Sequence, residues 1–203
     1  MMKISYAITV CNELKEIQRL LTFLLENKRE TDEIVVLFDK QSGTSEVWSY
    51  LNEQDIKLEA KSFKHHFADW KNYLTSLCSG DYIYQIDADE MLSLYVLNNL
   101  PIILQYNNID VLKVPRINTV KGVTPEHISK WQWNVNESGW INFPDYQWRI
   151  YKNDGKIKWI NKVHEVLTDY KTMSYLPIEK PWCLTHDKTI EKQEKQNKYY
   201  NTL

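Results

Sequence analysis

The first half of the chain alternates between two patterns of hydrophobic and polar positions. Apolar runs rich in β-branched and aromatic residues predict strands at residues 4–10, 33–39, 56–60 and 82–86. Apolar residues that recur at helical spacing predict helices between these strands, at residues 14–28, 45–51 and 68–77. Strands that alternate with helices of this length indicate βαβ units, and therefore a mostly parallel sheet.

The second half is less regular. Pro101 suits the first turn of a helix, and residues 118–144 show so little periodicity that they are predicted to form a long functional loop. The charged tail from residue 189 is predicted to be a solvated helix. Further strand patterns lie at residues 110–116, 146–152 and 156–160. The last two patterns are separated by Asn-Asp-Gly, which predicts a hairpin.

Composition and charge narrow the class of protein. The chain has 203 residues, enough for one domain, and 25 Lys and Arg residues against 27 Asp and Glu residues leave a net charge of −2. A protein that binds nucleic acid through its phosphates normally carries a basic excess, so that class is disfavoured. The five glycines form neither a GxGxxG nor a GxxxxGK pattern, which disfavours the usual dinucleotide and P-loop cradles.

Cysteine usage and hydropathy predict a cytoplasmic protein without a transmembrane segment. The three cysteines are odd in number and widely spaced, which is typical of a reducing compartment. Residues 91–109 are uncharged like a membrane span, but the asparagines, Pro101 and Gln105 among them favour a helix in water. The chain opens directly on a strand pattern, without a secretory or transit pattern before it.

Polar and acidic residues follow three of the predicted strands. Thr9, Asn12 and Glu13 lie at the end of the first strand, Asp39 ends the second, and Asp-Ala-Asp-Glu at residues 87–90 follows the fourth. Because ligands bind beyond the carboxyl ends of parallel strands, these residues are expected to meet at one edge of the sheet. Clustered carboxylates repel each other unless a cation compensates them, and Mg²⁺ or Mn²⁺ bound with a diphosphate would do so.

Longer motifs surround these strand ends. They are Thr-Val-Cys-Asn-Glu at residues 9–13, Asp39, Phe-Ala-Asp-Trp-Lys-Asn at 67–72, the run from Gly80 to Glu90, Val-His-Glu at 163–165 and Thr-His-Asp at 185–187. In this order they resemble glycosyltransferase family 2, and within it the lipopolysaccharide-core β-glucosyltransferase type. The resemblance covers most of the chain. It implies an α/β protein of the GT-A fold: a Rossmann-like, mostly parallel sheet flanked by helices, with a small mixed or antiparallel portion on the acceptor side.

The same resemblance implies a metal-dependent, inverting transfer of a sugar from a nucleoside-diphosphate sugar, with UDP-sugars favoured, to a hydroxyl group of a glycan or lipid-linked acceptor. Residues 1–203 would form one domain, with a nucleotide-sugar-binding half at 1–117 and an acceptor and catalytic half at 118–203. The implied nucleotide-binding residues are Thr9, Asn12, Glu13, Asp39, Lys71, Asp87, Ala88 and Arg149. The implied ligands of Mn²⁺ or Mg²⁺ are Asp87, Asp89 and His186.

Several of these residues also have a structural interpretation. Arg149 could bind the diphosphate with its guanidinium, or it could tie a strand to the acidic edge. His186 could equally be a surface histidine at the start of a helix. Trp131, Trp133 and Trp140 are expected to form an acceptor platform, although some of the tryptophans must lie in the core.

Inversion by direct displacement needs a carboxylate that takes the proton from the acceptor hydroxyl. A metal ligand is unsuited to this role because the bound cation lowers its basicity. Asp145, Glu165 and Asp169 remain as candidates in the second half. Glu165 is the predicted base, because the apolar residues that precede it would partly exclude water, and Asp145 is the alternative. A purely structural role for Glu165 would be an ion pair with a nearby basic residue.

Two other classes of function fit the sequence less well. The acidic edge would also suit a sugar-nucleotide nucleotidyltransferase, but the sequence has no glycine-rich phosphate loop. The 8 Trp and 13 Tyr residues would also suit a non-catalytic carbohydrate-binding module, but such a module has no need of three acidic strand ends. Release of a nucleoside diphosphate from a nucleotide sugar, dependent on Mn²⁺, would separate these three classes.

Overall fold

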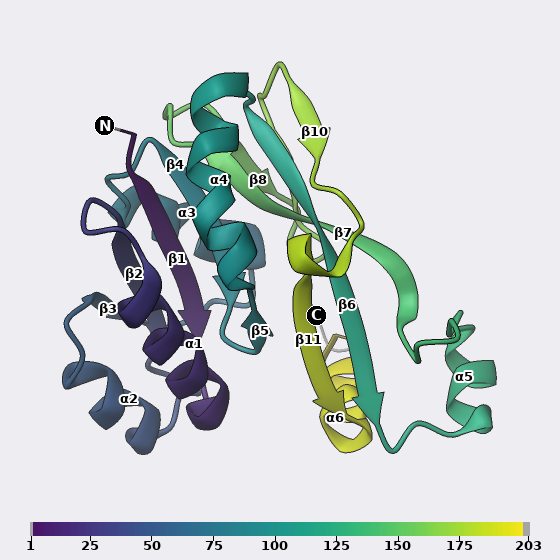
Figure 1. The fold of residues 1–203 in the computed structure, drawn as a ribbon. Coiled ribbons are helices and arrows are strands. Elements are labelled where there is room, and N and C mark those ends of the chain that lie inside the picture. Colours follow the sequence, from purple (N-terminus) through teal and green to yellow (C-terminus); the bar gives the residue numbers. More distant parts are fainter. Residues whose placement is uncertain (1, 201–203) are drawn as a thin grey trace.

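The first half folds into the predicted alternation of strands and helices. The computed structural model describes residues 2–200 (Figure 1). The elements of this half are β1 (Ile4–Val10), α1 (Leu14–Asn27), β2 (Glu33–Asp39), α2 (Ser45–Asn52), β3 (Lys57–Lys61), α3 (Phe67–Leu77) and β4 (Tyr82–Asp87). The strands lie in the order β3, β2, β1, β4 and all run parallel, which confirms the βαβ units.

The second half adds mixed strands to the same sheet. Its elements are β5 (Glu90–Met91), α4 (Leu94–Asn107), β6 (Val111–Lys121), α5 (Pro125–Trp131), β7 (Ile141–Lys152), β8 (Lys158–Ile160), β9 (Val166–Thr168), β10 (Met173–Tyr175), a short 3-10 helix (Lys180–Trp182), β11 (Leu184–Thr189) and α6 (Ile190–Tyr200). β7 runs antiparallel to both β4 and β6, whereas β11 runs parallel to β6 and antiparallel to β5. The predicted fold class, a mostly parallel sheet with a mixed portion in the second half, is confirmed.

Alternate residues of the central strands serve two hydrophobic clusters, one on each face of the sheet. Ile4, Tyr6 and Ile8 of β1 face the cluster that α1, α2 and α4 complete, whereas Ala7 faces a smaller cluster under α3. α4 lies in front of the sheet in Figure 1. These β1 residues are at most 1% exposed, so the strand is packed on both sides. A sheet anchored in this way fixes the position of its carboxyl edge, where the site is predicted.

The predicted hairpin at residues 146–160 is wrong. β8 does not pair with β7 but with β9, in a separate two-stranded sheet. β7 already has β4 on one side and β6 on the other, so it offers no free edge. β8 is held by α3 instead, because the Asn72 side chain accepts a hydrogen bond from the Trp159 backbone N–H and donates one to the Trp159 carbonyl, at 2.9 and 2.8 Å.

The helix predicted to begin at Pro101 begins earlier. α4 starts at Leu94 behind Ser93, whose Oγ accepts a hydrogen bond from the backbone N–H of Val96 at 3.1 Å, and Pro101 lies inside the helix. α4 is the uncharged stretch singled out in the sequence. No helix within residues 2–200 is long and apolar enough to cross a membrane.

Residues 118–144 do not form one loop. β6 extends to Lys121 and β7 begins at Ile141, opposite Asn118, so the two strands form an antiparallel ribbon, and β11 accompanies β6 as far as Lys121. α5 lies between them at the end of this ribbon and projects from the body of the molecule (Figure 1). Thr124 caps α5 and Pro125 occupies its first turn. This Thr-Pro pair is a helix-start signal that could have been found in the sequence.

Candidate active site

The carboxyl ends of β1, β2 and β4 bring the predicted nucleotide-binding residues to one edge. Asp39 ends β2 and is only 6% exposed. Its Oδ1 accepts hydrogen bonds from the backbone N–H groups of Gln41 and Phe63, both at 3.0 Å. These two bonds fix the carboxylate at the edge of the sheet, next to the loop that follows β1.

The loop after β1 is held by Glu13. Its Oε2 accepts hydrogen bonds from the backbone N–H groups of Asn12, at 3.0 Å, and of Cys11, at 2.9 Å. The end of β1 is joined to the end of β4 at two points: Thr9 Oγ1 donates to Asp87 Oδ1 at 3.3 Å, and the Ala88 N–H donates to the Thr9 carbonyl at 3.2 Å. The polar groups predicted from these strand ends therefore lie side by side.

Glu90 organises the centre of the acidic cluster. Its side chain is fully buried and accepts hydrogen bonds from Arg149 Nε and Nη2 at 2.9 and 2.7 Å and from Arg116 Nη1 at 2.8 Å. Arg149 Nη2 also donates to Asp87 Oδ2 at 2.7 Å. Burial alone would raise the pKa of Asp87, but the charges of Arg149 and Lys71 outweigh it and hold that pKa at about 2. Arg149 and Arg116 therefore offset the negative charges of Asp87 and Glu90. Arg149 ties its strand, β7, to the acidic edge, which is the structural role considered for it in the sequence.

Arg116 connects this cluster to Asp145, the alternative base. Its Nε and Nη2 donate to Asp145 Oδ2 at 3.0 and 2.8 Å. Asn118 Nδ2 donates to the same oxygen at 2.8 Å, and Gln147 Nε2 donates to Oδ1 at 2.6 Å. Burial raises the pKa of Asp145, but Arg116 and these hydrogen bonds more than offset that effect, so the pKa is lowered overall. Asp145 is held in its ionised form by four hydrogen bonds.

His186 meets Asp89 because β11 lies between β6 and β5. An ionised Asp145 can only accept, so Asn118 turns Nδ2 toward it and Oδ1 toward His186 Nδ1, at 2.8 Å. His186 Nδ1 must therefore carry a hydrogen, and in the neutral ring the lone pair of Nε2 faces Asp89 Oδ2 at 3.3 Å. A ring nitrogen and a carboxylate oxygen that face each other in this way are a donor pair that a cation can share.

Asp89 has a second basic neighbour. Lys192 Nζ from α6 lies 3.2 Å from Asp89 Oδ2. Burial favours the neutral carboxyl, but His186 and Lys192 hold the pKa of Asp89 far below its usual range. Asp89 is therefore an anion in contact with two basic groups.

The three predicted metal ligands do not form one group. Asp87 pairs with Arg149, whereas Asp89 and His186 contact each other. In the part of the chain that the structure describes, no cluster of three or more His, Cys, Asp and Glu side chains is arranged to hold a metal ion. A metal bound here would therefore take two ligands from the protein, and the remaining ligands from water or substrate.

Lys71 of α3 and Glu165, the residue before β9, form an ion pair. Lys71 Nζ lies 2.5 Å from Glu165 Oε1, and the side chains are 7% and 15% exposed. Lys71 also stands over the Trp159 ring, 4.5 Å from its centroid. The charge of Lys71 acts on Asp87 and that of Glu165 acts on Arg149, which places the pair beside the acidic cluster. The ion pair expected as the structural role of Glu165 is present.

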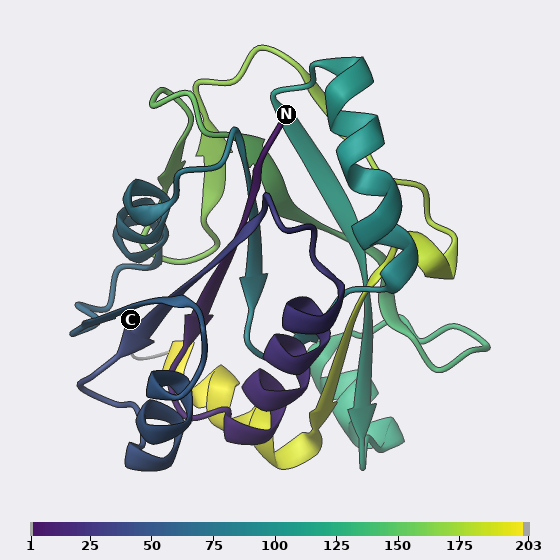
Figure 2. The same ribbon diagram turned by 60° about the vertical axis from the view of Figure 1, so that its left-hand side comes forward.

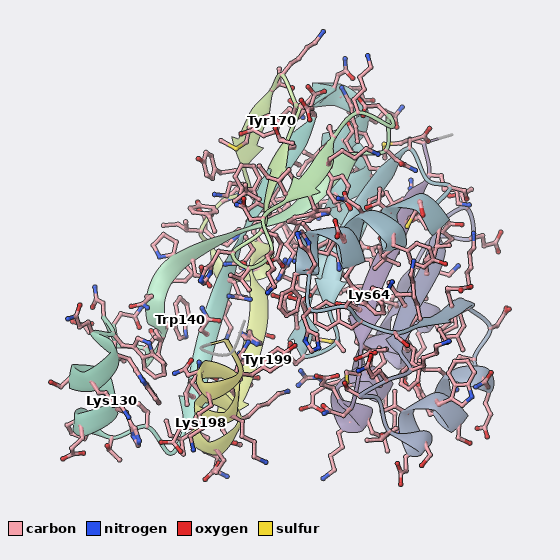
Figure 3. All side chains as sticks on the ribbon, turned by 180° about the vertical axis from the view of Figure 1, so that it is seen from behind. Lys64, Lys130, Trp140, Tyr170, Lys198 and Tyr199 are labelled. Atoms are coloured by element: carbon pink, nitrogen blue, oxygen red, sulfur yellow. The ribbon has the colours of Figure 1, made fainter. Side chains whose placement is uncertain are left out.

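The tryptophans predicted to bind the acceptor lie on the ribbon around α5. Trp131 and Trp133 are in contact, with ring centroids 4.7 Å apart, and Trp140 packs edge-on against Phe143 at 4.8 Å. All three are partly exposed, and α5 contains no buried residue. Figure 3, seen from behind, shows Trp140 and Lys130 on this projecting part. Trp148, in contrast, packs against Tyr170 on the body.

Parallel strands that end in carboxylates, joined to mixed strands that return a histidine to the same edge, are the arrangement of the GT-A fold. Solved structures of S. aureus TarS share this architecture. TarS 1-349 has a TM-score of 0.59 and 17% identity over 92% of this chain and 60% of its own. Its complex with UDP-GlcNAc has a TM-score of 0.62 and 15% identity over 92% and 58%. The chain thus spans less than two thirds of these proteins.

The model of glycosyl transferase family 2 matches residues 5–174. The chain belongs to this family. A search of curated proteins found no match.

Proposed function

We propose that this protein transfers a sugar from a nucleoside-diphosphate sugar, preferably a UDP-sugar, to a hydroxyl group of a glycan or lipid-linked acceptor, with inversion at the anomeric carbon. The observation that carries the proposal is that Asp39, Asp87, Asp89 and His186 all lie along the carboxyl edge of the sheet. Ligands of open α/β sheets bind at such an edge. Solved complexes of TarS with UDP and UDP-GlcNAc support a uridine nucleotide.

Asp39 is suited to recognise the nucleobase of the sugar donor. Its Oδ1 is occupied by two backbone N–H groups, so the carboxylate is fixed, and it remains an acceptor. Uracil carries an N–H donor between two carbonyl groups, which a fixed carboxylate can accept. Thr9, Asn12 and Glu13 lie on the adjacent strand end and would line the ribose. In this role Asp39 would discriminate against bases without such a donor.

Asp89 and His186 fit a divalent cation. Their facing atoms are 3.3 Å apart, close to the separation of about 3 Å between adjacent ligands at 2.0–2.2 Å from an octahedral ion. The Nδ1 hydrogen of His186 is donated to Asn118, the arrangement that orients a metal-binding imidazole. Mn²⁺ or Mg²⁺ at this position would attach the diphosphate and neutralise the charge of the leaving group.

Glu165 is better placed than Asp145 to accept the proton of the acceptor hydroxyl. Asp145 is engaged by four hydrogen bonds, including two from Arg116, which stabilise its ionised form and weaken it as a base. Glu165 makes one ion pair, with Lys71, and is partly exposed at the same edge. The partly exposed Trp131, Trp133 and Trp140 would provide aromatic faces for the sugar rings of the acceptor.

The test measures UDP binding and turnover of UDP-sugars by the purified full chain. Titration calorimetry with UDP is carried out with and without Mn²⁺, and UDP release is followed over a panel of UDP-sugars. Asp89→Asn should abolish the Mn²⁺-dependent part of UDP binding while the fold persists. Asp55→Asn, at an exposed site after α2, is the matched control. Absence of nucleotide binding by the wild type would refute the function, and undiminished Mn²⁺-dependent binding by Asp89→Asn would exclude Asp89 from the site.

A further inference from the structure

Helix α6 crosses the edge at which the sugar donor is proposed to bind. At one end of the helix, Lys192 Nζ lies 3.2 Å from Asp89 Oδ2 and 3.3 Å from Glu16 Oε1. At the other end, Tyr199 OH lies 2.9 Å from His65 Nδ1. Figure 2 shows α6 below the carboxyl end of β1, and Figure 3 shows Tyr199 on the side of α6 that faces the first half.

The spacing of these two contacts matches the sheet beneath them. Lys192 and Tyr199 are seven residues apart, which is two helical turns and a rise of about 10 Å on one face of the helix. Asp89 follows β4 and Asp39 ends β2, with β1 between them, which is two strand spacings or about 10 Å. Burial and the nearby carboxylate of Asp39 raise the pKa of Tyr199, so Tyr199 lies near the end of β2. α6 therefore lies across the strand ends, from Asp89, the proposed metal ligand, to Asp39, the carboxylate proposed to bind the nucleobase.

Lys192 Nζ occupies the position beside Asp89 at which a metal ion is proposed to bind. Burial lowers the pKa of Lys192, but Asp89 and Glu16 outweigh burial and raise it, so Lys192 is an ammonium ion. A divalent cation about 2.1 Å from Asp89 Oδ2 would lie next to this ammonium and repel it. The metal and Lys192 therefore cannot both hold Asp89 unless an anion joins them.

A diphosphate is such an anion. Lys192 is 34% exposed and its flexible side chain can turn from one partner to another without moving the helix. The other charged groups that face it are Glu13, Glu16 and Lys188. Lys188 Nζ donates to Gln196 of α6, and its charge acts on Asp89, whereas Lys192 Nζ contacts Asp89 directly. Lys192 is thus the cation in best position to meet a diphosphate that arrives beside Asp89.

We propose that Lys192 is a donor-binding residue that changes partner: it holds Asp89 and Glu16 before the sugar donor binds, and it turns to the diphosphate when the metal takes Asp89. This inference rests on the proposed function. It has two consequences for the wild type. Mn²⁺ alone binds weakly because it must displace Lys192, and UDP strengthens Mn²⁺ binding because the diphosphate accepts the displaced ammonium. By reciprocity, Mn²⁺ strengthens UDP binding by the same factor.

The experiment compares Mn²⁺ and UDP binding by the wild type and Lys192→Gln. Mn²⁺ binding is measured by calorimetry and by the electron paramagnetic resonance signal of free Mn²⁺, without and with UDP. In Lys192→Gln, Mn²⁺ alone should bind several-fold more tightly, because its competitor is gone. UDP in the presence of Mn²⁺ should bind about tenfold or more weakly, the effect of one lost hydrogen bond to a charged group. Lys192→Arg should restore most of the UDP affinity, since the charge remains.

Lys195→Gln is the matched control, because Lys195 is exposed on the same helix. Circular dichroism confirms that each variant is folded, and Lys192→Arg provides the measurement if Lys192→Gln does not fold. Mn²⁺ and UDP affinities of Lys192→Gln within twofold of the wild type would overturn the inference, as would weaker binding of Mn²⁺ alone. If the wild type binds Mn²⁺ and UDP but Lys192→Gln behaves like it, only the inference fails. If the wild type binds no UDP under any condition, the proposed function fails.

Discussion

Replacement of Glu90 by Gln should strongly destabilise the protein. Glu90 is fully buried and receives N–H groups on both carboxylate oxygens. Oε1 accepts from Arg149 and Arg116, and Oε2 accepts from Arg149 and the backbone of Asp87. Glutamine has nearly the same shape, but whichever oxygen becomes an amino group then faces two donors. The substitution therefore removes a charge and two hydrogen bonds without creating a cavity.

The expected loss is about 3–5 kcal/mol. A hydrogen bond to a charged group contributes about 1.5–3 kcal/mol, so two of them give about 3–6 kcal/mol. Breaking a buried ion pair by removal of one partner costs about 3–5 kcal/mol. Arg149 keeps Asp87 and Arg116 keeps Asp145, so neither arginine is left without a carboxylate. The remaining ion pairs favour the lower part of the range.

The assay is urea unfolding followed by tryptophan fluorescence, with the melting temperature as a second measurement. For a chain of this size a loss of 3–5 kcal/mol corresponds to a decrease in melting temperature of about 6–20 °C. Glu26→Gln, on the exposed face of α1, is the control and should stay within about 0.5 kcal/mol of the wild type. Adding Arg116→Gln completes a double-mutant cycle that isolates the Glu90–Arg116 pair. A loss below about 1 kcal/mol for Glu90→Gln would refute the view that this carboxylate neutralises both arginines.

Further predictions concern catalysis, the acceptor and pH. Glu165→Gln should lower kcat about 10²-fold or more and leave UDP affinity nearly unchanged; normal turnover would exclude Glu165 as the base and favour Asp145. Trp131→Ala combined with Trp133→Ala should raise the KM for the acceptor and leave hydrolysis of the sugar donor intact, whereas equal loss of both would indicate a structural role. Burial raises the pKa of Glu33, but hydrogen bonds from Ser5 and other neighbours hold it at about 2. The wild type should therefore have a higher free energy of unfolding than Glu33→Gln at pH 7, and this difference should decrease between about pH 4.5 and 2. Urea unfolding of both proteins over this pH range measures it.

The strands and helices of the first half could be predicted because each carries its own period of apolar residues. β1 and β2 are buried on both faces, and their apolar runs reflect this. Pro101 and residues 118–144 were misread because local signals were weighed without their caps, Ser93 and Thr124. The partner of β8 could not be predicted in this way. It depends on β7 being enclosed by β4 and β6, which is a property of the whole sheet.

The candidate site, like the fold, has a part that could be predicted from the sequence and a part that could not. Thr9, Glu13 and Asp39 could be placed at one edge, because parallel strands end together. Glu90 and Arg116 were missed as organising residues because their contacts span residues that are far apart in sequence. One signal was present in β6, where Arg116 and Asn118 are two residues apart and therefore on the same face of the strand.

The ion pairs at the edge leave Asp89 and His186, the proposed metal ligands, outside the arginine contacts of the acidic cluster. The sequence shows clustered carboxylates and suggests that a metal must neutralise them. Arg149 and Arg116 pair with Asp87, Glu90 and Asp145 from neighbouring strands, at contacts of 2.7–3.0 Å, so that two cations are shared by three carboxylates. Asp89 instead contacts two groups that a ligand can displace, the imidazole of His186 and the ammonium of Lys192. A divalent ion and a diphosphate that enter together change the net charge of the edge little, whereas either one alone adds a charge that nothing offsets, and this is the physical reason to expect them to bind as a pair.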